Sequence, residues 1–322
     1  MGVDLGGSKI LSAVVDAHGK ILASDYRPTQ AEEGINAVVN NILKSARAAT
    51  EKSQIPLAQI AAIGLGAPGI SNPETGIIYR SPNLPDWHHV PLRDIVANAL
   101  KKKVFLINDA NAAALGEMEY GVAKGCRNFI YITISTGIGG GIIIDGELYT
   151  GATGMAGEVG HIVVEPDGMP CNCGGVGCWE LYASGSAIAR RAREKIQQGR
   201  KTRLLKIAGG DLDKIDALLI KKAAEQGDAL ARKLVAETAR YLGIGLGSLI
   251  NIFNPELIVF GGGLSKMGDA LLEPAIREAG RRSYHDAYKV VKFALAELGD
   301  NSGVLGAAVY ARNELKKLKK AG

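Results

Sequence analysis

Apolar and polar positions follow the same order twice along the chain. Residues 2–22, GVDLGGSKILSAVVDAHGKIL, predict a strand, a glycine-rich turn, a second strand and a turn that leads into a third strand. Residues 129–149, FIYITISTGIGGGIIIDGELY, predict the same arrangement. Each stretch is followed by helical material and then by an apolar strand that ends in glycines, at 60–69 and at 256–265. The chain is therefore expected to carry one α/β pattern in each of two halves.

Further elements lie between and after the two repeats. The apolar spacing of residues 35–50 suits a helix that covers a sheet. KKKVFLIND, residues 101–109, predicts a buried strand that ends in two polar residues, and a helix is expected to begin at residue 110. Residues 184–240 are expected to be mostly helical, although the charged stretch at 197–216 has no place in this pattern.

Composition is that of a globular protein large enough for two domains. Of the 322 residues, 47% are hydrophobic and 22% are charged, and no apolar run approaches the ~18 residues of a membrane span. The net charge of +5 comes mostly from dispersed basic residues, and an aromatic content of 5% offers little surface for stacking on bases. Neither a nucleic acid nor a membrane is therefore an expected partner.

Few residues precede Asp4, so the first strand is either short or begins upstream of Met1.

Three of the four cysteines lie close together in the sequence. Cys171, Cys173 and Cys178, with His161 ten residues upstream, fit a tetrahedral zinc site of three thiolates and one imidazole. Such a closed site would be structural, because no position is left for a substrate. The alternative is a set of ordinary free cysteines with a surface histidine. Four cysteines are too few for a disulfide framework, and no export segment is present, so the expected compartment is a reducing cytoplasm.

Many of the 42 glycines gather beside the apolar strands. The backbone amides of Gly6, Gly7 and Ser8 can approach phosphate oxygens because no Cβ is in the way, and STGIGGG at 135–141 can do the same from the second half. Neither turn fits a P-loop or a dinucleotide fingerprint, since each leads into a strand. A glycine-rich hairpin without a ligand remains the alternative for either turn alone. Two equivalent turns, together with GGGLS at 261–265, favour a ligand with phosphates in a cleft between the halves.

Several motifs, in this order, resemble the sugar kinases of the ROK family, its glucokinases in particular, within the actin-like and hexokinase-like ATPase superfamily. They cover nearly the whole chain: DLGGSK at 4–9, GAPG at 66–69, SPNLPDW at 81–87, NDANAAALGE at 108–117, STGIGGG at 135–141, and GEVGH with CNCGGVGCWE between 157 and 180. The resemblance implies two RNase H-like α/β domains with a cleft between them, ATP and Mg²⁺ in the cleft, a hexose beside them and a structural Zn²⁺. The expected domains are residues 1–117, completed by a C-terminal helix at 303–322, and residues 118–302, which contain the zinc loop 161–178. A dimer or tetramer of identical chains is expected.

The same resemblance assigns roles to individual residues. Asp109 would accept the proton from the 6-hydroxyl of glucose as the γ-phosphoryl group moves, whereas without the resemblance it would cap the helix that follows. Asp4 would align Mg²⁺ and Lys9 would neutralise phosphate charge, or each would be a surface turn residue. His161 would bind zinc through one ring nitrogen and a sugar hydroxyl through the other. The expected hexose ligands are Asn83, Asn108, Asp109, Glu158, His161 and Glu180. The expected nucleotide-binding residues are Asp4, Gly6, Gly7, Ser8, Lys9, Thr136, Gly137, Gly139, Gly262 and Gly263.

The sequence is also compatible with other functions. Sugar-responsive repressors of the same family carry an additional N-terminal helix-turn-helix domain, and this chain reaches DLGGSK by residue 4, which leaves no room for a DNA-reading helix in the segment given. Against a sugar-binding module without catalysis stand Asp109 and both glycine turns. Among kinases, mannose, glucosamine, N-acetylated hexosamines or fructose could replace glucose, and polyphosphate could replace ATP. Glu117 gains no role from its spacing.

Overall fold

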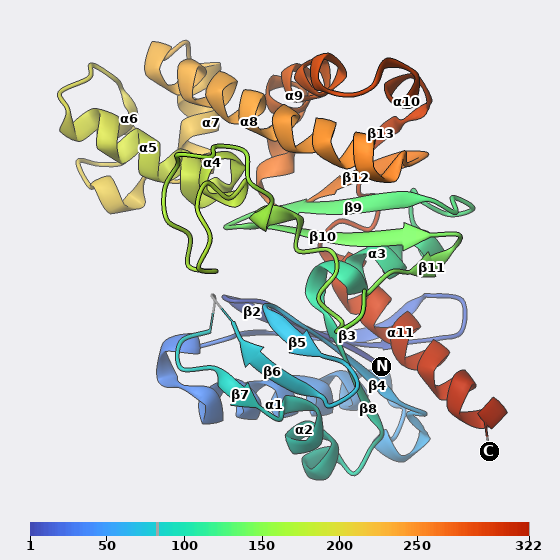
Figure 1. The fold of residues 1–322 in the computed structure, drawn as a ribbon. Coiled ribbons are helices and arrows are strands. Elements are labelled where there is room, and N and C mark those ends of the chain that lie inside the picture. The colour runs from blue at the N-terminus through green and yellow to red at the C-terminus, as the bar shows by residue number, and fades with distance from the viewer. Residues whose placement is uncertain (82–83, 322) are drawn as a thin grey trace. The chain divides into compact units, whose positions relative to one another are not determined.

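The computed structural model describes residues 1–81 and 84–321, and the chain forms two compact units (Figure 1). Unit 1 is assembled from three separate segments and unit 2 from two. Their ranges are Met1–Tyr131, Gly141–Gly157 and Ala296–Gly322 for unit 1, and Ile132–Gly140 and Glu158–Leu295 for unit 2. The domain boundary expected after residue 117 stays a prediction.

Two five-stranded sheets have the same strand order, which confirms the duplication expected from the sequence. The first sheet is ordered β3-β2-β1-β4-β8 and the second β11-β10-β9-β12-β13. In the first sheet, β1 to β3 pair antiparallel and β4 and β8 continue in parallel. In the second, β10 and β11 are antiparallel and β12 and β13 are parallel. The strands are β1 Gly2–Leu5, β2 Lys9–Val15, β3 Ile21–Pro28, β4 Ile63–Ala67, β8 Val104–Asn108, β9 Phe129–Ile134, β10 Ile138–Ile144, β11 Glu147–Leu148, β12 Leu257–Gly261 and β13 Lys292–Leu295.

The parallel strands β4 and β12 are buried along their whole length. Every residue of β4 (IGLGA) and of β12 (LIVFG) is buried, as expected of strands whose two faces are both covered. Strand β1 has only four residues, but three of them are buried and the strand pairs with β2 on one side and β4 on the other. A short first strand is therefore sufficient, because it lies inside the sheet.

A third, smaller sheet interrupts the repeat between β4 and β8. Its strands pair antiparallel in the order β5-β6-β7. They span Ile70–Asn72, Ile77–Arg80 and His88–Val90. Ile78 of β6 belongs to the same buried cluster as Leu84 and Trp87, so this sheet is part of the core of unit 1.

Helix α1 (Ile35–Ser53) packs against strands β2 and β3 of the first sheet, as its apolar spacing predicted. Val38, Ile42, Ala46 and Ala49 are fully buried, and their spacing of three and four residues places them on one face of the helix. The other helices of unit 1 are α2 Leu92–Leu100, α3 Asp109–Tyr120 and α11 Ser302–Ala321.

The last helix, α11, packs against α3 and against strands β1 and β4 with backbone in direct contact. A Cβ atom at Gly64 in β4 would overlap the carbonyl oxygen of Ala307 in α11. A Cβ atom at Gly306 would overlap the carbonyl oxygen of Ala112 in α3. Glycine is required at both positions because the neighbouring atoms belong to the backbone and cannot rotate away.

We expect Gly64→Ala to destabilise unit 1 by at least the ~1–3 kcal/mol typical of an overpacked core, because the new methyl group has to push α11 away from β4. Gly66→Ala, two residues along the same strand, is the matched control. Its Cβ atom would lie at an ordinary 3.6 Å from Ala112 Cβ and from Val3 O. Urea denaturation of both variants measures the difference, and equal midpoints would contradict the close packing of α11.

Unit 2 is largely helical after its zinc loop, as expected for residues 184–240. The stretch at 197–216 begins at the end of α5 and contains α6 and a short turn at Leu212–Lys214. The helices of unit 2 are α4 Glu180–Ala183, α5 Gly185–Gln197, α6 Leu204–Ile207, α7 Ala217–Glu225, α8 Ala229–Phe253, α9 Asp269–Arg282 and α10 His285–Val290. Among the described residues, no helix combines the length and the apolar character needed to cross a membrane.

Candidate active site

The first glycine turn joins β1 to β2 in unit 1. The N–H of Gly6 donates to the carbonyl oxygen of Lys9 at 2.7 Å, and the hydroxyl of Thr29 donates to the carbonyl oxygen of Gly6 at 2.7 Å. The amide of Gly6 therefore closes the turn. The amides of Gly7 and Ser8 have no backbone acceptor within residues 1–81 and 84–321, which leaves these two N–H groups for an anion.

Asn108 and Asp109 lie where strand β8 ends and helix α3 begins. Asn108 is the N-cap of α3: its Oδ1 accepts from the N–H of Ala110 at 2.9 Å and from that of Asn111 at 3.1 Å. Asp109 is the first helical residue, and its Oδ1 accepts from the N–H of Ala110 at 2.8 Å. The capping role considered for Asp109 thus belongs to Asn108. Asp109 is left with a second carboxylate oxygen for other chemistry.

Four charged side chains of unit 1 influence one another: Asp4, Lys9, Asp109 and Asp300. The Nζ of Lys9 lies 3.7 Å from Oδ2 of Asp300. Burial raises the pKa of Asp4 to about 7, and the carboxylate of Asp109 raises it as well, whereas Lys9 lowers it. Burial also raises the pKa of Asp109. Carboxylates that repel one another in a partly buried position favour a bound cation, and oxygen ligands of this kind suit Mg²⁺.

We expect Asp4→Asn to stabilise the ligand-free protein at pH 8. The folded state binds the Asp4 proton up to about pH 7, whereas the unfolded state loses it near pH 4, so stability is lost as the pH rises between these values. The gain should be at most about 4 kcal/mol, since the pKa is raised by about three units and each unit corresponds to about 1.4 kcal/mol. Thermal unfolding at pH 4 and pH 8 measures it. The control Asp300→Asn removes a neighbouring carboxylate that is 67% exposed and contributes least to the raised pKa of Asp4, so it should change the stability much less than Asp4→Asn. An Asp4→Asn variant no more stable than the native protein at pH 8 would contradict the raised pKa.

Glu117 in helix α3 is fully buried, and nothing in the sequence singled it out. Its Oε1 accepts from the N–H of Leu298 at 3.0 Å and from the hydroxyl of Ser302 at 2.7 Å, and its Oε2 accepts from the N–H of Glu297 at 3.1 Å. These bonds fix the segment that carries Asp300 and leads into α11. The partners lie about 180 residues away in the sequence, so no local pattern could have indicated them.

The second glycine turn, between β9 and β10 in unit 2, is held by the start of α5. The N–H of Gly185 donates to the carbonyl oxygen of Ser135 at 2.7 Å, and the hydroxyl of Ser186 donates to that of Thr136 at 2.6 Å. These bonds take the carbonyl groups of the turn. In the part of the chain that the structure describes, the amides of Thr136 and Gly137 have no backbone acceptor and are available to an anion.

A cavity of about 420 Å³ lies beside this turn within unit 2, a size that suits a small organic ligand. It brings together Thr136 and Gly263, two of the residues expected to bind nucleotide. The sequence did not indicate its apolar wall, because such residues carry no motif. Leu218 is 65% exposed although it is apolar, and so is available to a ring of the ligand. The other lining residues include Ser135, Gly185, Ser186, Ala189, Arg193, Ile215, Lys221, Leu264, Lys266 and Met267.

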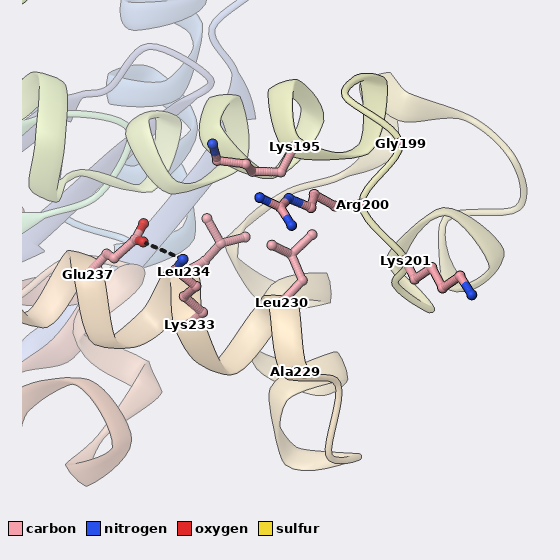
Figure 2. A pocket seen from close by; sticks show the side chains of 9 residues that line it. All are labelled: Lys195, Gly199, Arg200, Lys201, Ala229, Leu230, Lys233, Leu234 and Glu237. Carbon is pink, nitrogen blue, oxygen red and sulfur yellow. Dashed lines mark ion pairs between the residues drawn. The ribbon is translucent and has the colours of Figure 1, made fainter.

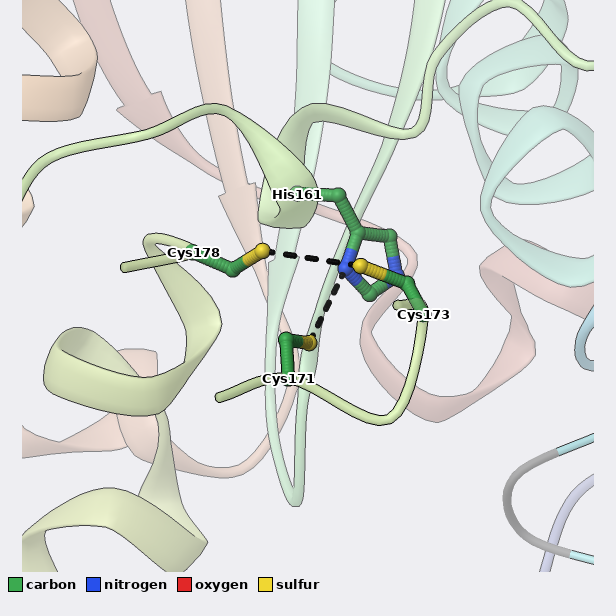
Figure 3. A group of neighbouring side chains, drawn as sticks. All are labelled: His161, Cys171, Cys173 and Cys178. Atoms are coloured by element: carbon green, nitrogen blue, oxygen red, sulfur yellow. Dashed lines mark hydrogen bonds between the residues drawn. The ribbon is translucent and has the colours of Figure 1, made fainter. Parts of the chain in front are cut away.

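The expected zinc ligands converge in unit 2 (Figure 3). One ligand atom from each of His161, Cys171, Cys173 and Cys178 lies within 4.8 Å of all the others. The Sγ atoms of Cys173 and Cys178 are 3.6 Å apart, and Sγ of Cys171 is 3.6 Å from Nδ1 of His161. A tetrahedral zinc ion with Zn–S bonds of about 2.3 Å holds its ligand atoms roughly 3.7 Å apart. The residues therefore fit a zinc ion.

The thiols of this cluster differ in acidity. All are free cysteines. Burial raises the pKa of Cys178 to about 12, whereas the N–H of Gly175, which donates to the Cys173 sulfur, lowers the pKa of Cys173. Thiols have to lose their protons to bind a metal, so the affinity of the cluster for zinc rises with pH.

Residues on either side of the cluster anchor it within unit 2. Nε2 of His161 lies 3.8 Å from Oε2 of Glu158, while Nδ1 faces the thiols. The carboxylate thus orients the ring from the nitrogen that does not face the cluster. Trp179, next to Cys178, is fully buried and donates its indole N–H to the carbonyl oxygen of Tyr241 in α8 at 2.8 Å.

Glu180 connects the zinc loop to the second glycine turn. Its Oε2 accepts from the N–H of Ile138 at 2.9 Å. A Cβ atom at Gly137 would overlap this same oxygen, so glycine is needed there for the carboxylate to reach the turn. The zinc loop and the glycine turn are in this way held to one another by a single side chain.

The family of the chain follows from a comparison over its length. The family model described as "ROK family" matches residues 1–314. The chain belongs to the ROK family. This confirms the resemblance drawn from DLGGSK, NDANAAALGE and the cysteine stretch.

Known ROK proteins similar to this chain include kinases and repressors. The glucokinase of Thermotoga maritima is 40% identical over 319 residues, which cover 98% of each chain. A solved ROK family glucokinase from Streptomyces griseus, in complex with glucose and AMPPNP, matches with a TM-score of 0.85 and 38% identity, over 97% of this chain and 98% of that one. The xylose repressor of Caldicellulosiruptor bescii is 33% identical over 98% of this chain and 78% of the repressor. The likeness to the solved Streptomyces griseus glucokinase confirms the α/β fold that the resemblance implied.

The structure divides the expected site residues of this ROK protein between its units. Asn83 lies outside the described residues. Gly139 lies within strand β10 and not in the turn before it. Gly262 follows β12 with a φ of 83°, and a Cβ atom there would meet the backbone of Ile134. Unit 1 contains Asp4, Gly6, Gly7, Ser8, Lys9, Asn108 and Asp109, and unit 2 contains Thr136, Gly137, Gly139, Glu158, His161, Cys171, Cys173, Cys178, Glu180, Gly262 and Gly263.

Proposed function

We propose that this ROK protein is an ATP-dependent glucokinase, which transfers the γ-phosphoryl group of ATP to the 6-hydroxyl of glucose. The observation that carries the proposal is the carboxylate of Asp109, which does not cap helix α3 and whose pKa is raised by burial. A glucokinase 40% identical over 98% of this chain and a related glucokinase solved with glucose and AMPPNP support the choice of substrates.

Asp109 acts as the general base on the acceptor. One carboxylate oxygen takes the proton of the 6-hydroxyl while the hydroxyl oxygen forms its bond to the γ-phosphorus. The bond from this phosphorus to the oxygen that bridges to the β-phosphate breaks, and ADP leaves. A raised pKa makes Asp109 a stronger base than an exposed aspartate. The N–H of Ala110 fixes the orientation of its carboxylate.

Unit 1 also supplies groups for the phosphates. Mg²⁺, when bound, neutralises the charge that the phosphates carry during the transfer. Asp4 would hold it through water, consistent with a carboxylate whose pKa of about 7 reflects burial and a neighbouring carboxylate. The free amides of Gly7 and Ser8 and the ammonium group of Lys9 would bind phosphate oxygens.

Unit 2 supplies the nucleotide cavity and most of the hexose ligands. The cavity of about 420 Å³ beside Thr136 and Gly263 would hold the base and ribose of ATP. Hexose hydroxyls would bind to Glu158, His161 and Glu180. In unit 1, Asn108 is a further proposed hexose ligand, through the amide nitrogen that it does not use in the helix cap. Carboxylates and amides around the ring discriminate between epimers, because a wrong epimer leaves a buried partner unpaired.

Zinc has a structural role in this proposal. Its four ligands leave no open position, so it would stabilise the loop whose flanks carry Glu158 and Glu180. Thiolate ligands have to stay reduced, so the proposal includes a reducing cytoplasm as the compartment. It also includes an assembly of identical chains, a dimer or tetramer.

A coupled assay for ADP release tests the activity. Glucose is expected to give the highest kcat/KM among glucose, mannose, glucosamine, N-acetylglucosamine, N-acetylmannosamine and fructose, with Mg²⁺ and ATP present. Polyphosphate in place of ATP tests the donor. A preference for another hexose would correct the substrate and leave the kinase assignment intact. Sugar binding without ADP release from any hexose would instead favour a regulator.

A further inference from the structure

A second cavity of unit 2 shares no lining residue with the nucleotide cavity. It has a volume of about 470 Å³ and lies between the end of α5, the loop after it and the first turns of α8 (Figure 2). The loop belongs to the charged stretch at 197–216, for which the family resemblance offered no role. Neither the proposed kinase reaction nor the zinc cluster uses any of these side chains.

The wall formed by the loop is held in place by the N-cap of helix α8. The side chain of Asp228 is buried and accepts from the N–H of Ala231 in the helix at 2.9 Å. The same carboxylate accepts from the hydroxyl of Thr202 at 2.9 Å and from the N–H of Arg203 at 2.7 Å. Because one buried carboxylate ties the loop to the helix, the opening between them is a built feature of the fold.

Positive charge dominates the lining of this cavity. Lys195, Arg200, Lys201 and Lys233 carry cationic groups, and Glu237 is the one acidic residue among the lining residues that the structure describes. Lys233 pairs with Glu237 at 3.9 Å. Arg200 and Lys201 have no acidic partner in the described part of the chain. Figure 2 shows the guanidinium group of Arg200 pointing between Lys195 and the apolar side chains of α8.

Glu237 does not neutralise this excess. Besides its pairing with Lys233, it interacts with the buried guanidinium of Arg191 in α5. Arg191 also donates to the hydroxyl of Thr238 at 2.6 Å, which carries no charge. Glu237 is therefore shared between two cations, Lys233 and Arg191. The cavity therefore has room for further negative charge.

The floor of the cavity is apolar. Leu230 is partly buried and Leu234 is almost fully buried, and both come from one face of α8. The aliphatic stem of Lys195 adds to this surface. A ligand that fills the cavity thus needs an anionic group for the cations and a larger body for the leucines.

We propose that this cavity binds a phosphate monoester of a small organic molecule. A phosphate dianion can engage more than one cation at once, and the planar guanidinium of Arg200 can donate two parallel hydrogen bonds to its oxygens. Inorganic phosphate alone would leave most of a cavity of about 470 Å³ unfilled and the leucine floor without a contact. A sugar phosphate and a nucleoside monophosphate share the required chemistry.

Isothermal titration of the full chain tests the proposal. The protein is first saturated with glucose, Mg²⁺ and a non-hydrolysable ATP analogue, and is then titrated with glucose 6-phosphate, with AMP or with inorganic phosphate. At least one ester should bind, at least ~10-fold more tightly than inorganic phosphate. The ester that binds more tightly shows whether the ligand of this cavity is a sugar phosphate or a nucleoside monophosphate. No turnover is needed, so the result does not depend on the kinase assignment.

Arg200→Ala is the decisive variant and Arg203→Ala its matched control. Arg203 is exposed, lies three residues away and does not line the cavity, so its replacement removes the same charge without touching the site. Arg200→Ala should weaken ester binding at least ~10-fold, and Arg203→Ala less than ~2-fold. Equal effects of the two variants would reduce the binding to general charge attraction and overturn the proposal. So would the absence of ester binding at millimolar concentration, or phosphate binding as tightly as either ester.

Discussion

Replacement of Asp109 by Asn is expected to lower kcat for glucose phosphorylation by at least two orders of magnitude, roughly the contribution of a positioned base. Asn keeps the shape of the side chain and can still accept the N–H of Ala110, but it cannot take a proton from the 6-hydroxyl. The affinity for glucose should change much less, because an interaction made mainly in the transition state affects kcat. A coupled assay gives kcat, and calorimetric titration gives the dissociation constant.

The helix cap offers a sharp control for this variant. Because Asn108 caps α3, Asp109→Asn should unfold at a urea concentration no lower than that of the native protein, and at neutral pH the loss of a buried carboxylate with a raised pKa should move this concentration upward. Asn108→Ala, in contrast, removes two hydrogen bonds to the helix N-terminus and should cost about 1 kcal/mol of stability. Near-normal turnover of Asp109→Asn would remove the residue from the reaction, whatever the effect of Asn108→Ala on stability.

Replacement of Cys173 by Ser is expected to lower the zinc content from about one ion per chain and to weaken glucose binding strongly. Loss of the metal frees the loop between His161 and Cys178. Glu158 is then no longer held beside the ring of His161, and Glu180 is no longer held at the glycine turn. The nucleotide cavity should keep most of its affinity, because the Ser135 to Gly137 turn is also held by Gly185 and Ser186 of α5.

Elemental analysis of protein washed with chelator measures the zinc, and titrations with glucose and with a non-hydrolysable nucleotide separate the two affinities. Cys126→Ser is the matched control, since Cys126 lies outside the cluster. A fully active native protein that contains no zinc would contradict the structural role. An equal loss of glucose and nucleotide affinity in Cys173→Ser would show that the whole of unit 2 had unfolded.

The sequence predicted the duplicated fold because each strand of the repeat has a local signature. The apolar runs around residues 2–22 and 129–149 are bounded by glycine turns, and the structure places them at matching positions in two sheets of equal order. The cysteine cluster was also predictable, since its ligands lie within 18 residues and their chemistry is distinctive. In both cases the information lies in residues close together in the chain.

The rest of the site depends on contacts that no local pattern contains. Glu117 acquires its partners from a segment about 180 residues away, and the apolar wall at Leu218 comes from a helix without a motif. The distinction between Asn108 and Asp109 depended on which of two adjacent polar residues caps α3, and composition cannot separate them. The third sheet, β5 to β7, interrupts the repeat between β4 and β8. The comparison of the two repeats could not predict it, because only one of them contains it.

The position of helix α11 has a consequence for how the protein is made. Unit 1 begins with residue 1, yet the helix that packs against its strands β1 and β4 is formed by residues 302–321. As the chain leaves the ribosome, the backbone at Gly64 and Gly116 therefore stays uncovered through the synthesis of all of unit 2. Unit 1 is therefore the first to be translated and the last to complete its core. A nascent chain interrupted before residue 302 would expose to chaperones the surface of β1, β4 and α3 that α11 covers in the finished protein.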